Sequence, residues 1–517
     1  MRPSTTPTHR LGSMALLLAL TVTAGCAREQ DAVGWFGVEE PGGLGDVHSP
    51  ILDFSSVSAP PAAVPAGEEA YTELEGERIQ GYLRTITDFS VEDRAAGNQA
   101  WGRVTGREAH ARTSEWIAEQ FREAGLEDVE VQEYEGSDPL WWPTSWEVRL
   151  LADPRYGEAS RDVVLESAFP SLGIELPWGG LTAALIDAGS VDDELAPDFD
   201  GAGKVAVLRV EPASGVYSVR RPTTDRAQEL FDRGAAAVLI AVKQAGNMHV
   251  RDFRRCGGPC FALGTADGDF LMSVMDAASA EGLGEDLMVH LDLEAEIDPS
   301  PVGHNVLGIA PGDSEENVIV NAHSDGWFDG AGDNGDGTSV LIALARHFAQ
   351  PEHRHERTLV FVASGGHHTP GANGPGHLVE MNPDLTGRTV AVVNLEHVAQ
   401  YYVPADTWTP EPTEQPMGFG ISNLSPAIVD IAERARERYG FAIREDIGTG
   451  IAGDLGGYRP LGVPLMQAIH SGVFYHTSGD VFGTISVPGL ERAARFYAYL
   501  VGELAATPQA DLMRAGN

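Results

Sequence analysis

The sequence predicts an α/β protein with a mixed, mostly parallel sheet sandwiched by helices. Short apolar stretches typical of buried strands alternate with helical patterns through the second half of the chain. The strand-like stretches are 305–312, 317–323, 357–364, 389–397 and 462–469. The stretch 338–350 between them has the apolar spacing of a helix. In such sheets the chemistry gathers at the carboxyl ends of the strands.

A smaller α/β unit is expected ahead of this region. Residues 181–189 and 203–210 have strand patterns, and 227–242 has a helix that passes through Gly234 into a strand. The stretch 201–210, together with RGAAAVLI, resembles the protease-associated domain, a lid-like insert of exported peptidases. The alternative is a continuous α/β domain without a separate insert.

The domain organisation follows from these patterns and from the length of 517 residues. We expect a signal peptide, a flexible tether, the first part of the main α/β domain, an insert that resembles the protease-associated domain, and the second part of the main domain. Their expected ranges are 1–25, 26–68, 69–160, 161–300 and 301–510.

The charge balance of the chain is strongly acidic. Asp and Glu total 76 against 35 Lys and Arg, which gives a formal net charge of -41. Such a surface repels phosphate backbones, so the sequence predicts no nucleic-acid partner. Solubility is the simpler explanation of the acidity, in preference to a role in binding cations.

The N-terminus has the pattern of an export signal. His9 and Arg10 precede an apolar stretch from Met14 to Val22 and then the small residues before Cys26. The Ala-Gly-Cys ending resembles the lipobox of bacterial lipoproteins, in which the cysteine is lipidated. We therefore expect an exported protein held at the bacterial cell envelope by its N-terminal lipid only, facing the periplasm or the exterior. Plain secretion with an incidental cysteine is the alternative.

The remaining cysteines, Cys256 and Cys260, are separated by Gly-Gly-Pro. In an exported protein such a pair predicts a local disulfide, with free thiols as the alternative.

Potential metal ligands stand at the ends of the predicted strands. His323 ends the stretch 317–323, His367 and His368 follow 357–364, and Glu396 lies at the end of 389–397. Strand ends are rigid supports that meet at one rim of a sheet, as a metal site requires. Asp325 lies two residues after His323, so on an extended backbone it can accept the imidazole N–H and orient that ring.

Asp333 lies in a glycine-rich loop that leads into the predicted helix 338–350. Its two carboxylate oxygens can bridge two ions, and the surrounding glycines let the backbone close around it. Trp327 and Phe328, earlier in the same segment, either line the substrate pocket or pack the loop.

These motifs resemble the co-catalytic di-zinc exopeptidases typified by bacterial leucyl aminopeptidases and glutamate carboxypeptidase II. The resemblance covers about residues 75–150 and 300–505 and follows the family's order of motifs. His-x-Asp and Asp-Asn match at His323 and Asp333, and the late Tyr-His-Thr matches at His476. The resemblance implies two zinc ions held by five side chains. These ligands are His323, Asp333, His368, Glu396 and His476.

The sequence departs from the family where Glu-Glu is usual, because His367 and His368 occupy both positions. The resemblance assigns the first position to the general base and the second to a metal ligand. Imidazole suits zinc, so His368 can replace the ligand. His367 is the candidate base, assisted by Asp325 as the residue that orients His323. Glu396 stands where the family has Asp.

The implied function is an exported aminopeptidase that hydrolyses peptides through a water activated by two zinc ions. One alternative is a catalytically impaired relative that keeps the fold for binding. Another is a glutaminyl-cyclase-like acyltransferase with a single zinc. His397 is expected to be structural, because it points away from Glu396 on an extended strand. Asp454 is expected either to bind a substrate amine or to cap a turn.

Overall fold

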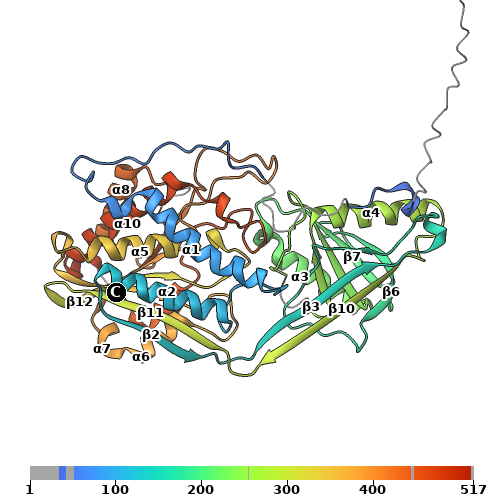
Figure 1. Cartoon of the computed structure of the whole chain (residues 1–517), viewed down its shortest axis with the longest axis horizontal. Coiled ribbons are helices and arrows are strands. Elements are labelled where there is room, and N and C mark those ends of the chain that lie inside the picture. Colours follow the sequence, from blue (N-terminus) through green and yellow to red (C-terminus); the bar gives the residue numbers. More distant parts are fainter. Residues whose placement is uncertain (1–33, 42–51, 254–255, 444–446, 514–517) are drawn as a thin grey trace, which may run out of the picture.

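The computed structural model describes residues 34–41, 52–253, 256–443 and 447–513. It contains two units, each built on its own sheet, and the chain passes between them along neighbouring strands (Figure 1). The first unit has a seven-stranded sheet with the order β16-β17-β15-β12-β14-β11-β2, and a two-stranded β1-β13 pair accompanies it. The second unit has an eight-stranded sheet with the order β4-β3-β10-β6-β7-β8-β9-β5.

The strands of the first unit are β2 (Glu127–Glu135), β11 (Val302–Ala310), β12 (Ser314–His323), β14 (Arg357–Ser364), β15 (Thr389–Leu395), β16 (Gly418–Ile421) and β17 (Leu465–Ile469), with the pair β1 (Gly102–Arg103) and β13 (Gly326–Trp327). Its helices are α1 (Gly76–Ala95), α2 (Glu108–Ala124), α5 (Asp336–Phe348), α6 (Gly374–Met381), α7 (Pro383–Thr386), α8 (Pro426–Tyr439), α9 (Leu455–Tyr458), α10 (Val487–Ala506) and α11 (Gln509–Leu512).

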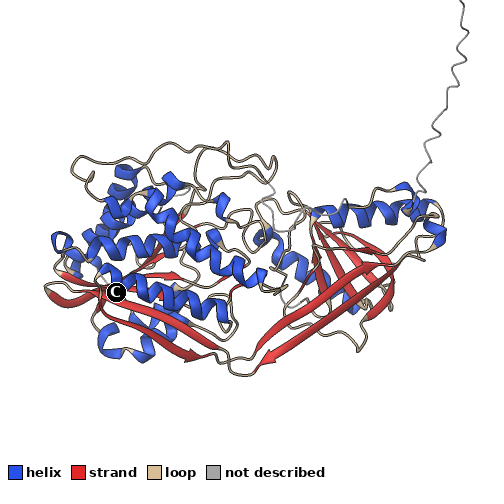
Figure 2. Cartoon of the chain, viewed as in Figure 1, coloured by secondary structure: helices blue, strands red, loops and turns tan. Residues whose placement is uncertain are grey.

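The central strands of this sheet are parallel. β12 pairs in parallel with β14 and β15, and β15 with β17, whereas β11, β2 and β16 add antiparallel edges. Apolar side chains of α1, α2, α5, α8 and α10 form a core on one face, and those of α6 and α9 form a smaller one on the other. Coverage on both faces explains why β15 is buried throughout. The expected mixed α/β sandwich is confirmed (Figure 2).

The second unit begins earlier than the boundary expected at residue 161. Its strands are β3 (Leu140–Leu150), β4 (Val163–Val164), β5 (Phe169–Pro170), β6 (Leu181–Ser190), β7 (Val205–Val210), β8 (Ala237–Val242), β9 (Cys260–Leu263) and β10 (Met288–Asp298), with helices α3 (Arg220–Asp232) and α4 (Thr265–Ala280). β3 belongs here because it pairs with β10 from Leu140 to Leu150.

The segment expected as a flexible tether, 26–68, makes specific contacts at some of its described residues. Trp35 is fully buried, stacks on Tyr156 and meets the ring of Phe270 edge-on. Further along, the main-chain oxygen of Pro60 accepts a hydrogen bond from Arg492. Burial of a large aromatic ring overrides the linker-like composition around it. The expected signal peptide and Cys26 lie outside the described residues, and none of the described helices is long and apolar enough to cross a membrane.

Cys256 and Cys260 are both buried, and the structure has them as free thiols. The hydroxyl of Ser171 lies 3.4 Å from the Cys256 sulfur. The disulfide expected between these cysteines is therefore not formed in this structure.

Candidate metal centre

Three of the expected ligands meet around the end of β12. His323 is its last residue and is fully buried. Its Nε2 atom lies 3.4 Å from Oδ1 of Asp333 and 3.9 Å from Oε1 of Glu396, which directly follows β15. β12 and β15 are parallel neighbours, so their carboxyl ends bring these side chains to one rim. We call the space between His323, Glu396 and Asp333 the first position.

Asp333 is held between two groups of histidines by its own backbone. Its amide and that of Gly332 donate to the carboxylate of Asp480, at 2.9 and 2.8 Å. A Cβ atom on Gly332 would lie 1.9 Å from Nε2 of Gln400, so a larger residue would displace the side chain that also donates to Asp480. Oδ1 of Asp333 thereby faces both His323 and His368, and its Oδ2 faces His476.

His368 and His476 also lie close to the carboxylate of Asp333. Nε2 of His368 is 3.2 Å from its Oδ1, and Nε2 of His476 is 3.4 Å from its Oδ2. Ligand-type atoms of Asp333, His368 and His476 all lie within 4.8 Å of one another. We call the space between these side chains the second position.

Asp325 supports the site differently from the expectation. Nδ1 of His323 is 3.0 Å from the main-chain oxygen of Asp325 and 3.5 Å from its carboxylate. The carboxylate instead accepts the backbone N–H groups of His367 and His368, at 3.3 and 3.1 Å. The tight turn after His323 brings the carbonyl to the ring. Asp325 therefore links the end of β12 to the paired histidines.

The second unit reaches into the second position. Oδ1 of Asp252, a fully buried residue, lies 2.7 Å from Nδ1 of His476. Arg251 donates from Nη2 to the main-chain oxygen of His368 at 3.0 Å. An isolated antiparallel bridge between Val250 and Thr477 ties the two segments together. A carboxylate on the far nitrogen of a metal-binding imidazole fixes that ring's orientation. Sequence analysis missed Asp252, because it is 224 residues away from His476.

His367 is held by Asp454, whose role the sequence left undecided. Nδ1 of His367 is 2.8 Å from Oδ1 of Asp454, and the other oxygen of Asp454 accepts from Ser364 at 2.9 Å. Nε2 of His367 lies 3.7 Å from Oε1 of Glu396, and its ring stacks on that of His323. Asp454 is thus a partner of the histidine in the base position.

His397 is part of the site, which corrects the expectation that it points away. Its Nε2 atom is 3.9 Å from Oδ1 of Asp333 and 3.8 Å from Oε1 of Glu396. The strand has ended at Leu395, and His397 has a φ of 56°, so the alternation of an extended backbone no longer applies. The side chain turns back toward the rim.

Burial and charge shift the protonation of the ligands in different directions. Burial opposes protonation of His323, but Asp325 and Asp333 outweigh it and raise its pKa, whereas the pKa values of the other histidine ligands shift the opposite way. Burial lowers the pKa of His476 to about 4, and it lowers the pKa values of His368 and His397 as well. Burial opposes ionisation of Asp333, but the neighbouring histidines outweigh it and lower its pKa. Neutral imidazoles and an ionised carboxylate are the forms that bind zinc.

Two buried imidazole nitrogens without hydrogen-bond partners indicate whether the residues of the site fit metal ions. Nε2 of His323 and Nε2 of His476 are buried and have no hydrogen-bond partner among the described residues, although both face Asp333. Leaving buried polar atoms unpaired is costly, and an ion would satisfy both of them. Imidazole and carboxylate are also the ligand types that zinc uses. The donor set therefore fits zinc at both positions.

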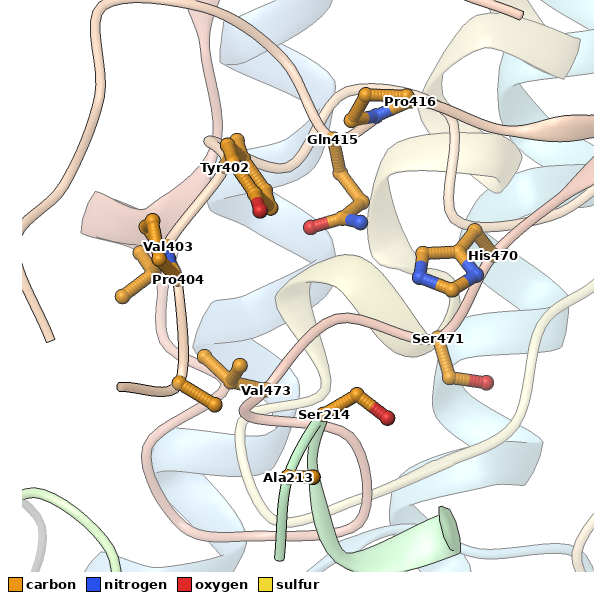
Figure 3. A pocket seen from close by; sticks show the side chains of 11 residues that line it. Ala213, Ser214, Tyr402, Val403, Pro404, Gln415, Pro416, His470, Ser471 and Val473 are labelled. Carbon is orange, nitrogen blue, oxygen red and sulfur yellow. The ribbon is translucent and has the colours of Figure 1, made fainter. Parts of the chain in front are cut away.

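A cavity of about 510 Å³ opens onto the site and is closed partly by the second unit. It is lined by His367, His368, Glu396, His397 and His476 together with Tyr217, Ser218 and Arg220. A second cavity of about 340 Å³ adjoins it and shares Ser214, His470 and Ser471. Figure 3 shows this neighbour, where His470 and Ser471 face Ser214 and the apolar side chains Val403, Pro404 and Val473 line one side.

Trp327 and Phe328 pack the junction of the two units and are not among the residues that line the cavity of about 510 Å³. Trp327 stacks on Trp142 at a centroid distance of 5.2 Å, and Phe328 meets Trp101 edge-on. Arg103 lies fully buried below the same loop and donates to the main-chain oxygens of Asp329 and Gly330 at 2.7 and 2.9 Å. These contacts fix the loop that carries Asp333.

Comparison with known proteins agrees with this geometry. Residues 305–501 match the model of peptidase family M28. No curated protein matches the chain in sequence. Both residue ranges that carried the expected resemblance, about 75–150 and 300–505, contribute to the unit that holds the site.

Solved structures share the fold across most of the chain. A peptidase M28 precursor from Shewanella amazonensis aligns with a TM-score of 0.62 and 18% identity, covering 85% of this chain and 96% of that one. BSAP, a zinc aminopeptidase from Bacillus subtilis, aligns with a TM-score of 0.57 and 20% identity, covering 85% and 98%. An aminopeptidase from Aneurinibacillus sp. strain AM-1 aligns at 0.53 and 19%, covering 85% and 96%. At such identities these likenesses confirm the fold.

Proposed function

We propose that this chain, whose residues 305–501 belong to peptidase family M28, is a metal-dependent aminopeptidase that uses two zinc ions. The observation that carries the proposal is the convergence of the five expected ligands: His323, His368 and His476 lie within 3.4 Å of the carboxylate of Asp333, and Glu396 lies 3.9 Å from His323. A bridging carboxylate with histidines on both sides is suited to two ions side by side.

Each ion would have its own set of side chains. His323 and Glu396 would hold one at the first position, and His368 and His476 would hold the other at the second, with Asp333 shared. When bound, zinc lowers the pKa of a coordinated water and polarises a carbonyl oxygen.

The protein's own contribution to proton transfer would come from His367. Asp454 holds its Nδ1 atom, which leaves Nε2 directed toward Glu396 and able to take a proton at the first position. Burial and His323 oppose protonation of this ring, but Glu396 and Asp454 raise its pKa overall. A histidine in this place gives the proton a fixed acceptor although the usual glutamate is missing.

The cavity would hold the N-terminal end of a peptide. It is walled by the ligands on one side and by Ser214, Tyr217 and Arg220 of the second unit on the other. A site closed by a second unit excludes water from the reacting bond. The smaller adjoining cavity, with its apolar wall, would accept part of the substrate beyond that bond.

Export and attachment belong to the same proposal and rest on the sequence. The N-terminal signal pattern would direct the chain out of the cytoplasm, and lipidation of Cys26 would hold it at the cell envelope. Replacement of Cys26 by Ser should move the protein from the membrane fraction to the soluble fraction.

The decisive experiment combines metal analysis with an aminoacyl-p-nitroanilide panel. We expect two zinc ions per chain and hydrolysis of at least one substrate. His367→Ala should keep both ions and lose about 10²- to 10⁴-fold in kcat, which is the usual contribution of a general base. His290→Ala, which removes a histidine of the second unit that bonds Thr182, is the matched control and should keep full activity.

Two outcomes would favour the alternatives. Two bound ions without turnover of any peptide substrate would overturn the peptidase proposal and favour a peptidase-like binding protein. One bound ion with cyclisation of N-terminal glutamine would favour a glutaminyl-cyclase-like acyltransferase.

A further inference from the structure

We propose that His397 is an additional ligand at the first position, so that His323, Asp333, Glu396 and His397 together surround one ion. This inference deepens the proposed function and rests on it. The expected ligand set assigned no role to His397, and its position follows from the structure alone.

Distances between the donor atoms carry the first step. Nε2 of His397 lies 3.8 Å from Oε1 of Glu396 and 3.9 Å from Oδ1 of Asp333. These separations are too long for hydrogen bonds. Two donors bound to one ion at about 2.0–2.2 Å lie at most ~4.4 Å apart, so both separations fit a shared ion.

His323 lies at similar distances from the two oxygens that His397 approaches. Nε2 of His323 lies 3.4 Å from the same oxygen of Asp333 and 3.9 Å from the same oxygen of Glu396. Nε2 of His323 and Nε2 of His397 therefore lie near the same two carboxylate oxygens, Oδ1 of Asp333 and Oε1 of Glu396.

Burial makes a merely structural imidazole hard to explain. The side chain of His397 is 1% exposed, and its Nδ1 atom has no hydrogen-bond partner among the described residues. Its ring meets that of Tyr475 edge-on at a centroid distance of 5.3 Å, which leaves the ring edge with Nε2 directed at the carboxylates. An ion would compensate for the buried polar ring.

The consequence is a nitrogen-rich first position. Two imidazoles with two carboxylates favour zinc, cobalt, nickel or copper over manganese, which prefers oxygen ligands. A fourth protein ligand would also leave the first position with less room for solvent than the second, where His368, His476 and Asp333 alone would bind.

The test is metal titration of the full chain with Co²⁺, followed by visible absorption and by equilibrium dialysis. Wild-type protein should bind two ions. His397→Ala should weaken one of them at least about tenfold and change its absorption, because a direct ligand is lost. His397→Gln is a second variant that keeps a polar side chain, and the melting temperature of each metal-free variant checks folding. His290→Ala is the matched control and should bind as wild type does.

Asp252→Asn separates the two positions. It should weaken the ion whose absorption His397→Ala leaves unchanged. Unaltered affinities and absorption in both His397 variants would overturn the inference, and so would a loss of activity with all metal binding intact. Metal binding that depends on His397 in a protein without peptidase activity would support the ligand and refute the aminopeptidase.

Discussion

The first and second positions of the metal centre are supported in different ways. At the first, His323 and Glu396 stand at the ends of parallel strands within one buried sheet. At the second, His368 and His476 lie in loops and depend on Arg251 and Asp252 of the other unit.

The difference shows what each unit contributes to the metal centre. The sheet of the first unit alone can place the ligands of the first position, because parallel strands end at the same rim. The second position is complete only when the second unit is docked, since Asp252 fixes the ring of His476. Docking of the units and binding of the second ion should therefore favour each other.

The largest effect should come from Asp333, the residue that both positions share. Asp333→Asn should lose both ions and all turnover, because an amide cannot supply two charged oxygens to the histidines. Zinc analysis and the substrate panel measure this. Asp329→Asn in the same loop is the control, since its carboxylate accepts from Trp101 Nε1. One ion retained in Asp333→Asn would show that the positions do not share this ligand.

The next largest effect should come from Arg103, which holds the Asp333 loop from the first unit. Arg103→Met would leave the oxygens of Ser90, Asp329 and Gly330 without their donor. The free energy of unfolding should fall by about 3–5 kcal/mol, as for other broken buried charge networks. Urea denaturation measures it.

Arg94→Met is the comparison for that experiment. Arg94 is 25% exposed and pairs loosely with Asp329 at 3.5 Å, so its loss should cost less than about 1 kcal/mol. Equal losses in both variants would mean that Arg103 is not a special support of this loop.

Asp252→Asn tests the dependence of the second position on the other unit. Loss of the charged partner of His476 should weaken the second ion about 10- to 100-fold and leave the first unchanged. Competition with a chelator measures the two affinities. Asp267→Asn, a buried carboxylate of the same unit that accepts from Ser167, controls for general damage. If both ions bound more weakly to the same extent, Asp252 would not support the second position in particular.

The smallest effect should come from Arg251→Met. This change removes one hydrogen bond to the main-chain oxygen of His368 and a guanidinium lying 4.3 Å from the Trp327 ring centroid. We expect roughly threefold to tenfold weaker binding of the second ion, which corresponds to about 1 kcal/mol. If only the ion at the first position bound more weakly, Arg251 would not support the second position.

The sequence predicted the first position best because the signal was local. Strand ends, spacing and the glycine-rich loop located His323, Asp333 and Glu396, and the structure brings them together. The mixed α/β sheet followed from the same alternation of strands and helices.

The parts that sequence analysis missed depend on contacts between distant segments or on unusual backbone. Asp252 and Asp454 are far in sequence from the histidines that they hold. His397 was assigned to the wrong side, because its positive φ cannot be read from a strand pattern. Trp35 was taken for linker, since nothing nearby in sequence shows the pocket formed by Tyr156 and Phe270.

The buried Trp35 would set the orientation of the molecule at a membrane if Cys26 were lipidated. It belongs to the described segment 34–41, drawn in blue, which lies beside α4 at the end of the second unit far from the first (Figure 1). Only nine residue steps separate it from Cys26, and at about 3.3–3.6 Å each they reach at most ~30 Å. If Cys26 carries the proposed lipid, the second unit lies next to the bilayer, between the membrane and the first unit. The unit with the metal ligands then projects outward, where long peptides can approach without meeting the headgroups.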